Sequence, residues 1–498
     1  MCNNQEIKLT KSQQRVFRQI KQFVGSDSAR VFILKGYAGT GKTTMLRFLV
    51  EHLIHEGIGY HLLASTGRAA AILNKATGTH SIARTIHSLI YSYSRLNQDL
   101  SDQETINVDS VGQLYLVFSP IQIERKDEDD NKTRLYIIDE ASMVSDMPET
   151  HITQAAFGTG RLLKELLDYD QAPNSKFLFV GDPCQLPPVN QAFSPALSAF
   201  YFSDTFSLTA QEAELTEIIR QADGNTITSV SHYFRRRYQS APEDESFYGG
   251  RRNWVKMGIQ SSRNIIFHSS RADLVGKYIQ HVKKHGYESG TLICKYNKNR
   301  FLLANEVRAA LGRSGAVAPN DLLLVMQNNH PSGLYNGDLV VVRSVSDDVH
   351  TRAELTFREV EVEDLATHTI RRTLLMEDLL YTGNNNLTSL QQSVLFVDFI
   401  QRMRKLGIRQ NTRDFDDMLL QDEHLNALRC SFGYALTCHK AQGGEWDEVF
   451  IDLPRNIMLN PTQGTYQWLY TAFTRARKKV HIVNDPLYIM QARYWLSD

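Results

Sequence analysis

Short apolar runs recur along the chain, and most of them end in a polar or glycine-containing turn that leads into a helical pattern. A buried parallel strand followed by a helix produces this pattern, and ligands in such folds bind at the carboxyl ends of the strands. The pattern therefore predicts an α/β fold of the doubly wound type, with one strand–helix core in each half of the chain. The runs that carry this prediction are residues 31–34, 61–66, 135–138, 177–180, 291–294 and 449–451.

A first stretch that interrupts the pattern is residues 91–134. It contains two short apolar runs, 114–118 and 121–123, on either side of Ser119-Pro120, and an acidic run at 127–130. Strand-like runs beside a turn signal indicate a hairpin, and four successive acids indicate a solvated loop. We expect a small β-hairpin insertion here.

A second stretch, residues 321–429, begins with β-like segments around an Asn336-Gly337 turn and continues as a mostly helical segment, 387–428. It predicts a small β-barrel with a helical extension, inserted into the second core. The expected parts are a first core (1–90 and 135–215), its insertion (91–134), a second core (216–320 and 430–498) and its insertion (321–429).

Residues 36–43 match the phosphate-loop motif G-x-x-x-x-G-K-[ST], with an apolar strand before it and a helical pattern after it. Its glycines let backbone N–H groups turn toward phosphate oxygens, and the helix start adds a positive end. Lys42 is placed for the β- and γ-phosphates of ATP, and Thr43 for Mg²⁺. The other residues expected to hold the nucleotide here are Gly36, Gly39, Thr40, Gly41 and Thr44.

Asp139 and Glu140 end the apolar run 135–138. Asp139 can hold Mg²⁺ through water, and Glu140 can polarise the attacking water. Two solvated acids are the plainer interpretation, but the upstream phosphate loop favours a catalytic one, since phosphoryl transfer needs both parts. Gln185, after the next apolar run, could contact the γ-phosphate and report hydrolysis to the second half of the chain.

Several polar residues stay open between two roles on chemistry alone. The amide of Gln13 could bond both edges of adenine, although a solvated helix face is the commoner situation. His87 could touch a phosphate backbone or be a structural histidine. Arg220 could reach the γ-phosphate across a cleft or be a surface arginine, and the basic, aromatic segment 234–238 could contact a nucleic-acid strand or form a solvated face.

Composition narrows the class of protein. The 498 residues contain 55 Lys+Arg and 55 Asp+Glu, so bulk charge gives no argument for a nucleic-acid partner. The five cysteines are scattered without a C-x-x-C pair, which indicates neither a zinc site nor a disulfide framework. No apolar stretch reaches the length of a membrane span. We expect a soluble, cytoplasmic protein without a membrane partner.

In this order, the motifs resemble those of the superfamily 1 DNA helicases, in the branch of RecD, Pif1 and Dda, over nearly the whole chain. The matching segments are L-T-x-x-Q at 9–13, the phosphate loop at 36–44, a strand-contacting motif at 65–70, T-I-H-S at 85–88, D-E-A-S-M at 139–143, G-D-x-x-Q-L-P-P-V at 181–189, L-T-x-x-x-R at 215–220, T-x-H-K-x-Q-G at 437–443 and Y-T-A-x-T-R-A at 470–476. One departure is Gly444-Glu445-Trp446, where the family often has Ser-Glu-Phe.

The resemblance implies two RecA-like cores that bind ATP and Mg²⁺ between them, a pin-bearing first insertion and an SH3-like second one. It implies an adenine contact for Gln13, γ-phosphate contacts for Arg220 and Arg475, and a nucleotide contact for Gly443. It further implies contacts to single-stranded DNA from Thr66, Arg68, Thr85, His87, Thr437, His439 and Lys440. The pin sequence aligns with no family motif, and we expect Phe118 to be its wedge residue.

The resemblance also implies the activity: an ATP-dependent DNA helicase that moves 5′ to 3′ on single-stranded DNA, unwinds duplexes and works as a monomer. Two alternatives stay open. One is a translocase that binds or remodels nucleic acid without unwinding it, and the other is an RNA helicase.

Overall fold

The computed structural model describes residues 8–78, 82–101, 111–123, 132–148, 154–219, 225–329, 331–384 and 386–485. Its first sheet has six parallel strands in the order β3-β2-β6-β8-β1-β9. These strands are β1 (Val31–Gly36), β2 (Gly59–Ala64), β3 (Arg84–Thr85), β6 (Arg134–Asp139), β8 (Ser175–Gly181) and β9 (Ala210–Leu215). The accompanying helices are α1 (Lys11–Val24), α2 (Lys42–His55), α3 (Gly67–Thr77), α4 (Ile86–Ile90), α6 (Leu162–Tyr169) and α7 (Ala199–Phe206), with short 3₁₀ turns at Ala141–Met143 and Pro195–Leu197.

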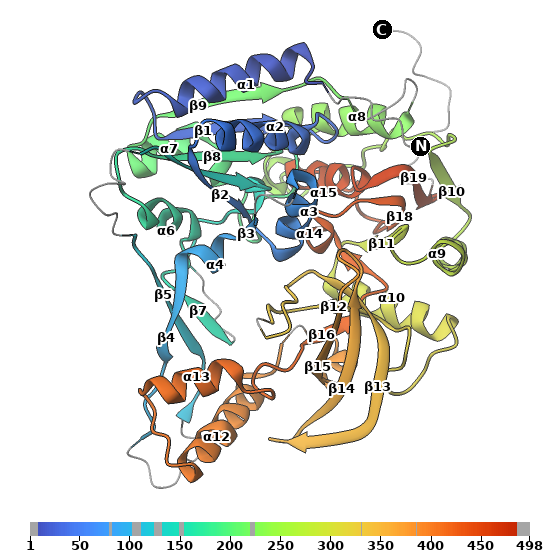
Figure 1. The fold of residues 1–498 in the computed structure, drawn as a ribbon. Coiled ribbons are helices and arrows are strands. Elements are labelled where there is room, and N and C mark those ends of the chain that lie inside the picture. The colour runs from blue at the N-terminus through green and yellow to red at the C-terminus, as the bar shows by residue number, and fades with distance from the viewer. Residues whose placement is uncertain are drawn as a thin grey trace, which may run out of the picture.

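Both faces of this sheet are covered, as Figure 1 shows. Phe32 and Leu34 of β1 pack in the cluster that contains α1, α2 and α3, whereas Val31 and Ile33 pack in the cluster that contains α4 and α6. Alternate residues of a strand point to opposite faces, so a strand that is buried on both sides reads as a continuous apolar run. This is why the apolar runs in the sequence located these strands.

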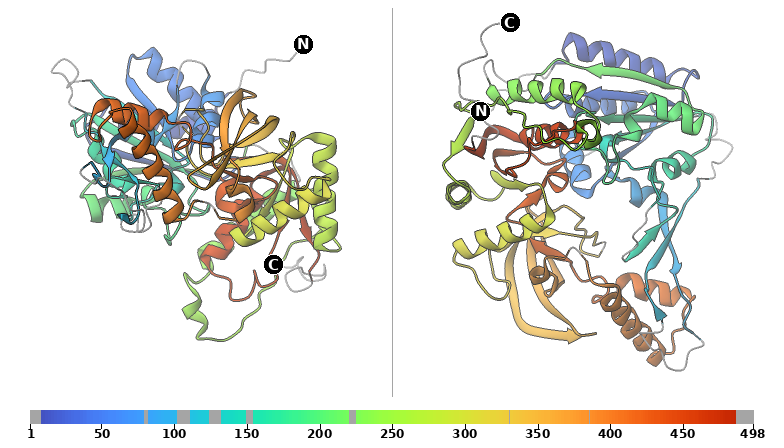
Figure 2. Two further views of the ribbon diagram at one scale, coloured as in Figure 1. Left: turned by 90° about the horizontal axis from the view of Figure 1, so that it is seen from below. Right: turned by 180° about the vertical axis from the view of Figure 1, so that it is seen from behind.

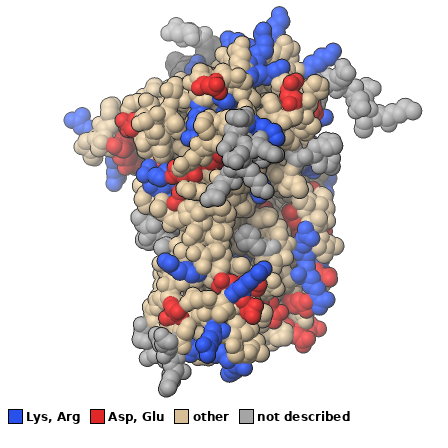
Figure 3. Space-filling model, turned by 60° about the vertical axis from the view of Figure 1, so that its left-hand side comes forward, with Lys and Arg blue, Asp and Glu red and all other residues tan. Residues whose placement is uncertain are grey.

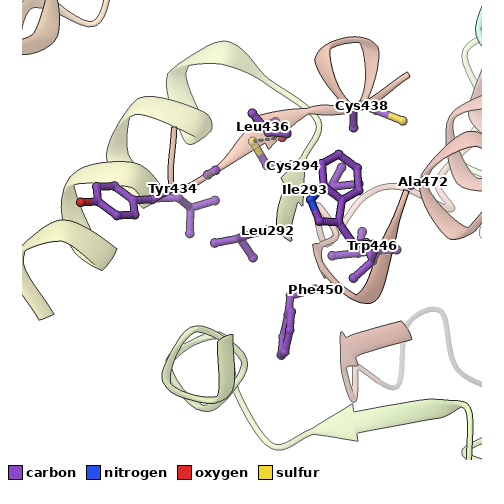
Figure 4. Packing of buried hydrophobic residues seen from close by; sticks show 14 of the residues in the cluster. Leu292, Ile293, Cys294, Tyr434, Leu436, Cys438, Trp446, Phe450 and Ala472 are labelled. Carbon is purple, nitrogen blue, oxygen red and sulfur yellow. Dashed lines mark hydrogen bonds between the residues drawn. The ribbon is translucent and has the colours of Figure 1, made fainter. Parts of the chain in front are cut away.

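The second sheet is also parallel, in the order β10-β19-β18-β11-β17. Its strands are β10 (Ile265–His268), β11 (Gly290–Cys294), β17 (Leu436–Thr437), β18 (Trp446–Asp452) and β19 (Ala476–Val483). Its helices are α8 (Thr226–Ser240), α9 (Arg271–His285), α10 (Asn297–Ala310), α14 (Cys438–Ala441) and α15 (Gln463–Phe473), and a 3₁₀ turn lies at Glu245–Tyr248. Figure 4 shows Trp446 and Phe450 of β18 packed around Leu292 and Ile293 of β11.

An antiparallel sheet follows within the second half, in the order β15-β14-β13-β12-β16. Its strands are β12 (Leu322–Val325), β13 (Leu339–Arg352), β14 (Leu355–Asp364), β15 (Ile370–Met376) and β16 (Cys430–Phe432). Helices α11 (Leu379–Thr382), α12 (Ser389–Lys405) and α13 (Arg413–Gln421) lie between β15 and β16. Because β16 pairs with β12, the sheet extends past residue 429, the expected end of the insertion.

A three-stranded sheet corrects the prediction for residues 91–134. Its strands are β4 (Tyr91–Leu96), β5 (Leu116–Pro120) and β7 (Ala155–Phe157). The hairpin expected around Ser119-Pro120 is wrong, since both residues lie within β5, which pairs with β4 on one side and β7 on the other. Local sequence missed this arrangement because β4 has few apolar residues and β7 lies outside the stretch. The acidic run at 127–130 falls outside the described residues.

The two insertions meet far from the nucleotide-binding loops (Figure 1 and Figure 2). Leu114, beyond β4, shares a buried cluster with Phe399 of α12 and Phe415 of α13. The backbone N–H of Leu100 donates to Gln410 Oε1 at 2.8 Å, and the N–H of Leu114 donates to Ser393 Oγ at 3.1 Å. The far end of the first insertion is therefore covered by the helical extension of the second.

The described residues can be searched for membrane-spanning helices, metal-binding clusters and paired cysteines. None of the helices in the described ranges is long and apolar enough to cross a bilayer. Within the same ranges, no three His, Cys, Asp or Glu side chains gather in a way that could hold a metal ion, and Cys184, Cys294, Cys430 and Cys438 are buried and free.

Candidate nucleotide site and inter-core cleft

The phosphate loop has a conformation that its glycines make possible. Gly39 and Gly41 have φ angles of 80° and 77°, a left-handed region in which a Cβ is strained. Thr40 Oγ1 donates to the carbonyl of Tyr37 at 2.8 Å, and Lys42 Nζ donates to the carbonyl of Gly36 at 2.6 Å. Lys42 thus lies folded against its own loop, at the first residue of α2.

Gln13 is joined to the phosphate loop rather than to solvent. Its side chain is 2% exposed, so the alternative of a solvated helix face is wrong. Its Nε2 donates to the carbonyl of Thr40 at 3.1 Å, while its Oε1 accepts the backbone N–H of Thr10 at 3.0 Å in a capping box. The amide of Gln13, for which the resemblance implies an adenine contact, thus holds α1 against the loop.

Two carboxylates lie at the ends of neighbouring strands of the first sheet. The pKa of Asp139 is raised to about 7, first by burial and then by the charge of Glu140. The charge of Lys42 lowers it. Glu140 has a left-handed backbone (φ 50°), and its Oε2 is buried with no hydrogen-bond partner among the residues that the structure describes. Burial also raises the pKa of Asp182, which follows β8 and is fully buried.

The second core reaches this edge of the sheet with two side chains of the segment 470–476. Tyr470 Oη accepts the backbone N–H of Ala38 at 3.0 Å and donates to Asp182 Oδ2 at 2.7 Å. Arg475 is 4% exposed and donates to the carbonyls of Thr471 and Gly444 at 3.1 and 3.3 Å. Neither guanidinium bond is to a carboxylate, which leaves Arg475 available to an anion.

Gln185 lies where the two cores touch. Its backbone carbonyl accepts Gln467 Nε2 at 3.2 Å, and the next N–H, of Leu186, donates to Thr471 Oγ1 at 3.0 Å. Among the described residues, its side-chain Oε1 is buried without a hydrogen-bond partner. From the T-x-H-K-x-Q-G segment, Gln442 Nε2 donates to the carbonyl of Leu186 at 3.0 Å. A displacement of Gln185 would therefore reach α15 directly.

Lys42, Asp139, Glu140, Gln185 and Arg475 line one cleft between the cores. Its volume of about 680 Å³ is within the usual range for a small-molecule site. The orphaned oxygens of Glu140 and Gln185 indicate a polar ligand there, because buried polar atoms are normally paired. A carboxylate beside a threonine hydroxyl suits Mg²⁺, so Asp139 and Thr43 fit that ion. The predicted residues that line the cleft are Gly39, Gly41, Lys42, Thr43, Thr44, Asp139, Glu140, Gln185, Gly443 and Arg475.

The three threonines expected to contact DNA all cap helices. Thr66 Oγ1 accepts Ala69 N–H at 3.2 Å at the start of α3. Thr85 and Thr437 do the same for α4 and α14, at 3.2 and 3.4 Å. Basic and acidic side chains are interspersed over the face in Figure 3, so surface charge does not mark a strand path on that face.

Among the other expected DNA contacts, His87 and Phe118 belong to one aromatic cluster. The centre of the Phe157 ring lies 4.8 Å from the centre of the Phe118 ring and 5.2 Å from the centre of the His87 ring. Burial lowers the pKa of His87 to about 4, so the ring is neutral. Phe118 lies within β5 opposite Tyr93. Its role as the wedge residue stays a prediction.

His439 and Lys440 lie on α14, beside the turn between β12 and β13. Lys440 Nζ donates to Asn336 Oδ1 of that turn. Burial lowers the pKa of Lys440 to about 8 and also lowers the pKa of His439. The turn of the second insertion therefore lies directly on one of the expected DNA contacts.

Arg68 lines the inter-core cleft, whereas the other expected DNA contacts do not. Its guanidinium carbon is 4.6 Å from the centre of the Trp446 ring, and it shares the cleft with Lys42 and Arg475. Its expected contact to a DNA strand stays a prediction. Arg220 falls outside the described residues, so its expected γ-phosphate contact stays a prediction.

Sequence reasoning singled out neither Tyr470 nor Asp182 as a site residue. Both stand in motifs that were recognised, Y-T-A-x-T-R-A and G-D-x-x-Q-L-P-P-V. A buried strand that ends in aspartate was a usable signal for Asp182. Tyr470 had no local signal, because its partner Ala38 comes from the other core.

Two family models match the chain, one described as an AAA domain (residues 8–243) and one as a UvrD-like helicase C-terminal domain (residues 432–483). The chain is 22% identical to the ATP-dependent RecD2 DNA helicase of Deinococcus radiodurans, over 90% of this chain and 46% of that protein. It is 29% identical to the ATP-dependent DNA helicase dda of Enterobacteria phage T4, over 43% of this chain and 39% of that protein. The matches thus span less than half the length of either relative.

Among solved structures, the Pif1 helicase from Bacteroides in complex with ADP-AlF3 and ssDNA is similar to this chain. The TM-score is 0.49 at 18% sequence identity, and the match covers 98% of this chain and 95% of that one.

Proposed function

We propose that the chain is a member of the RecD/Pif1-like branch of the superfamily 1 helicases and acts as an ATP-dependent DNA helicase, which hydrolyses ATP in the inter-core cleft to move along single-stranded DNA. One observation carries the proposal. The phosphate loop of the first core shares a cleft with Arg475 of the second core, so one bound nucleotide would contact both.

In this proposal Lys42 leaves the carbonyl of Gly36 to contact the β- and γ-phosphates, while the loop amides bind phosphate oxygens. Thr43 and Asp139 would hold Mg²⁺, which neutralises charge on the phosphates. Glu140 orients the attacking water with its unpaired Oε2 and takes a proton from it as the water oxygen bonds to the γ-phosphorus and the bond to ADP breaks.

Arg475, and Arg220 by resemblance, would contact the γ-phosphate from the second core. Loss of that phosphate removes the attraction between the cores, and the contacts of Gln185 with α15 carry the change across the cleft. Alternate closing and opening would then move the two cores along a strand.

The DNA path in this proposal runs past the helix starts capped by Thr66, Thr85 and Thr437, with Lys440 and His439 beside it. We further propose that the antiparallel sheet β12–β16 is the SH3-like insertion and that the sheet β4-β5-β7 is the pin-bearing one. Because the far end of the first insertion is covered by α12 and α13, we propose that the strands separate nearer its base than its tip. Movement 5′ to 3′ as a monomer is part of the same proposal.

The test is ATP-dependent strand displacement from matched duplexes with either a 5′ or a 3′ single-stranded tail, with Lys42→Ala as the control. We expect displacement from the 5′ tail alone and none by the variant. Displacement from the 3′ tail alone would keep the motor and reverse the polarity. DNA-stimulated ATPase without displacement would indicate a translocase, and faster displacement of an RNA duplex than a DNA duplex would indicate an RNA helicase.

A further inference from the structure

Arg68 reaches across the interface between the two cores. It stands in the first turn of α3, in the first core, and its guanidinium stacks on Trp446, which begins β18 in the second core. Trp446 is 2% exposed and packs in the core of the second sheet (Figure 4). A cation over a desolvated indole face is a favourable contact, so this pair joins α3 to the second core.

The backbone next to Trp446 is shaped around Arg68. A Cβ at Gly444 would lie 2.7 Å from Arg68 Nη2 and 2.6 Å from Trp446 Cη2, closer than such atoms approach. Any side chain at residue 444 would displace one or both of them. This gives a physical reason for glycine and tryptophan in the segment Gly444-Glu445-Trp446, where the sequence departs from the family pattern.

The same segment holds Arg475 on its other side. The carbonyl of Gly444 accepts Arg475 Nη1 at 3.3 Å, and the backbone N–H of Trp446 donates to the carbonyl of Arg475 at 2.9 Å. Arg68 and Arg475 therefore contact the same short segment, residues 444–446, from two sides. A displacement of Arg68 would move the groups that hold the Arg475 guanidinium.

We propose that Arg68 is a positioning residue for Arg475: by stacking on Trp446 and filling the space beside Gly444, it sets where the Arg475 guanidinium lies in the cleft. The inference rests on the proposed ATPase function and deepens it. It replaces the DNA contact that the resemblance implied for Arg68 with a role in coupling α3, whose first turn Thr66 caps, to the arginine that reads the γ-phosphate.

The first test compares Arg68→Gln with the wild type in three measurements: ATP turnover with saturating oligo(dT), affinity for a fluorescent ATP analogue, and affinity for oligo(dT) without nucleotide. We expect kcat to fall about 10-fold, the scale of a desolvated cation–π contact, with both affinities within about twofold. Arg18→Gln is the matched control, since it removes an exposed cation from α1 of the same core, and Arg18 does not line the cleft. A loss of oligo(dT) affinity with unchanged kcat would overturn the inference in favour of a DNA contact.

The second test separates positioning from a general structural effect. Arg68→Gln should cost little further kcat in an Arg475→Ala background, because a residue that acts through Arg475 has nothing left to position. Additive losses would overturn the inference. Trp446→Phe, which keeps a ring face, should retain most of the activity, and Trp446→Leu should resemble Arg68→Gln. A wild-type protein without ATPase activity would instead remove the proposed function itself.

Discussion

Tyr470 Oη lies 3.0 Å from the backbone nitrogen of Ala38 and accepts its hydrogen bond. One residue belongs to α15 of the second core and the other to the phosphate loop of the first, so a single hydroxyl joins the two halves of the cleft. The same hydroxyl donates to Oδ2 of Asp182, which is fully buried. The bond occupies a loop amide that a phosphate could use, and nucleotide binding would therefore compete with it.

Tyr470→Phe removes this hydroxyl and leaves Asp182 one donor short. We expect the nucleotide-free protein to lose about 1–3 kcal/mol of unfolding free energy, the cost of an unsatisfied buried acceptor. Urea unfolding of the variant measures the loss. An unchanged midpoint would mean that another donor replaces the tyrosine. Tyr201→Phe is the control. It removes a tyrosine hydroxyl that donates to the carboxylate of Asp146, in a less buried hydrogen bond.

Arg475→Ala should bind ATP but turn it over about 10³-fold more slowly, the scale of an arginine finger. The reason is that its guanidinium has only backbone carbonyl and threonine partners in the cleft and is free to bind a phosphate. Steady-state ATPase with oligo(dT) checks the prediction, beside nucleotide titration by fluorescence. A loss below about tenfold would place the finger at another residue, with Arg220 the first candidate.

Asp139 makes the nucleotide-free protein sensitive to pH. Burial and Glu140 raise the pKa of Asp139 above that of an unfolded aspartate, to about 7. The folded state then binds more protons than the unfolded one between those two pKa values. The contribution of Asp139 to stability is therefore present at acidic pH and is lost as pH rises to about 7.

Melting curves of the wild type and Asp139→Asn from pH 4.5 to 8 test this prediction. We expect the variant to melt higher than the wild type at pH 8, with a smaller difference at pH 4.5, because the neutral amide never carries the buried charge. The ATPase rate of the variant should be strongly reduced at every pH, since Mg²⁺ needs the carboxylate. Parallel curves across the whole range would contradict the raised pKa.

Gln410→Ala should separate strand displacement from ATP hydrolysis. Gln410 Oε1 accepts the N–H of Leu100, and its Nε2 donates to the carbonyl of Gln98, so the variant removes two of the hydrogen bonds between the two insertions. ATPase with oligo(dT) should stay within about twofold, because the cleft is remote, whereas displacement of a tailed duplex should fall. Lys405→Ala, an exposed change on α12, is the control. An equal fall in both activities would indicate unfolding of the insertion.

The sequence by itself determined the nucleotide half of the site and the two parallel sheets. A continuous apolar run, a glycine loop and a helix start are local features, and glycine can adopt the positive φ angles found at Gly39 and Gly41 without strain. Since strands in a parallel sheet end at one edge, Asp139 and Gln185 had to lie near the phosphate loop. Distant partners were not needed for any of these inferences.

Only the tertiary structure decided what touches across the cores and between the insertions. Gln13 is held by the phosphate loop, Arg68 stacks on Trp446, and β5 pairs with strands that its own sequence does not indicate. In each case the partner lies far along the chain, and the contact depends on how separately folded layers pack. A local pattern encodes backbone conformation and burial, but the direction of a long polar side chain follows from the surface that packs against it.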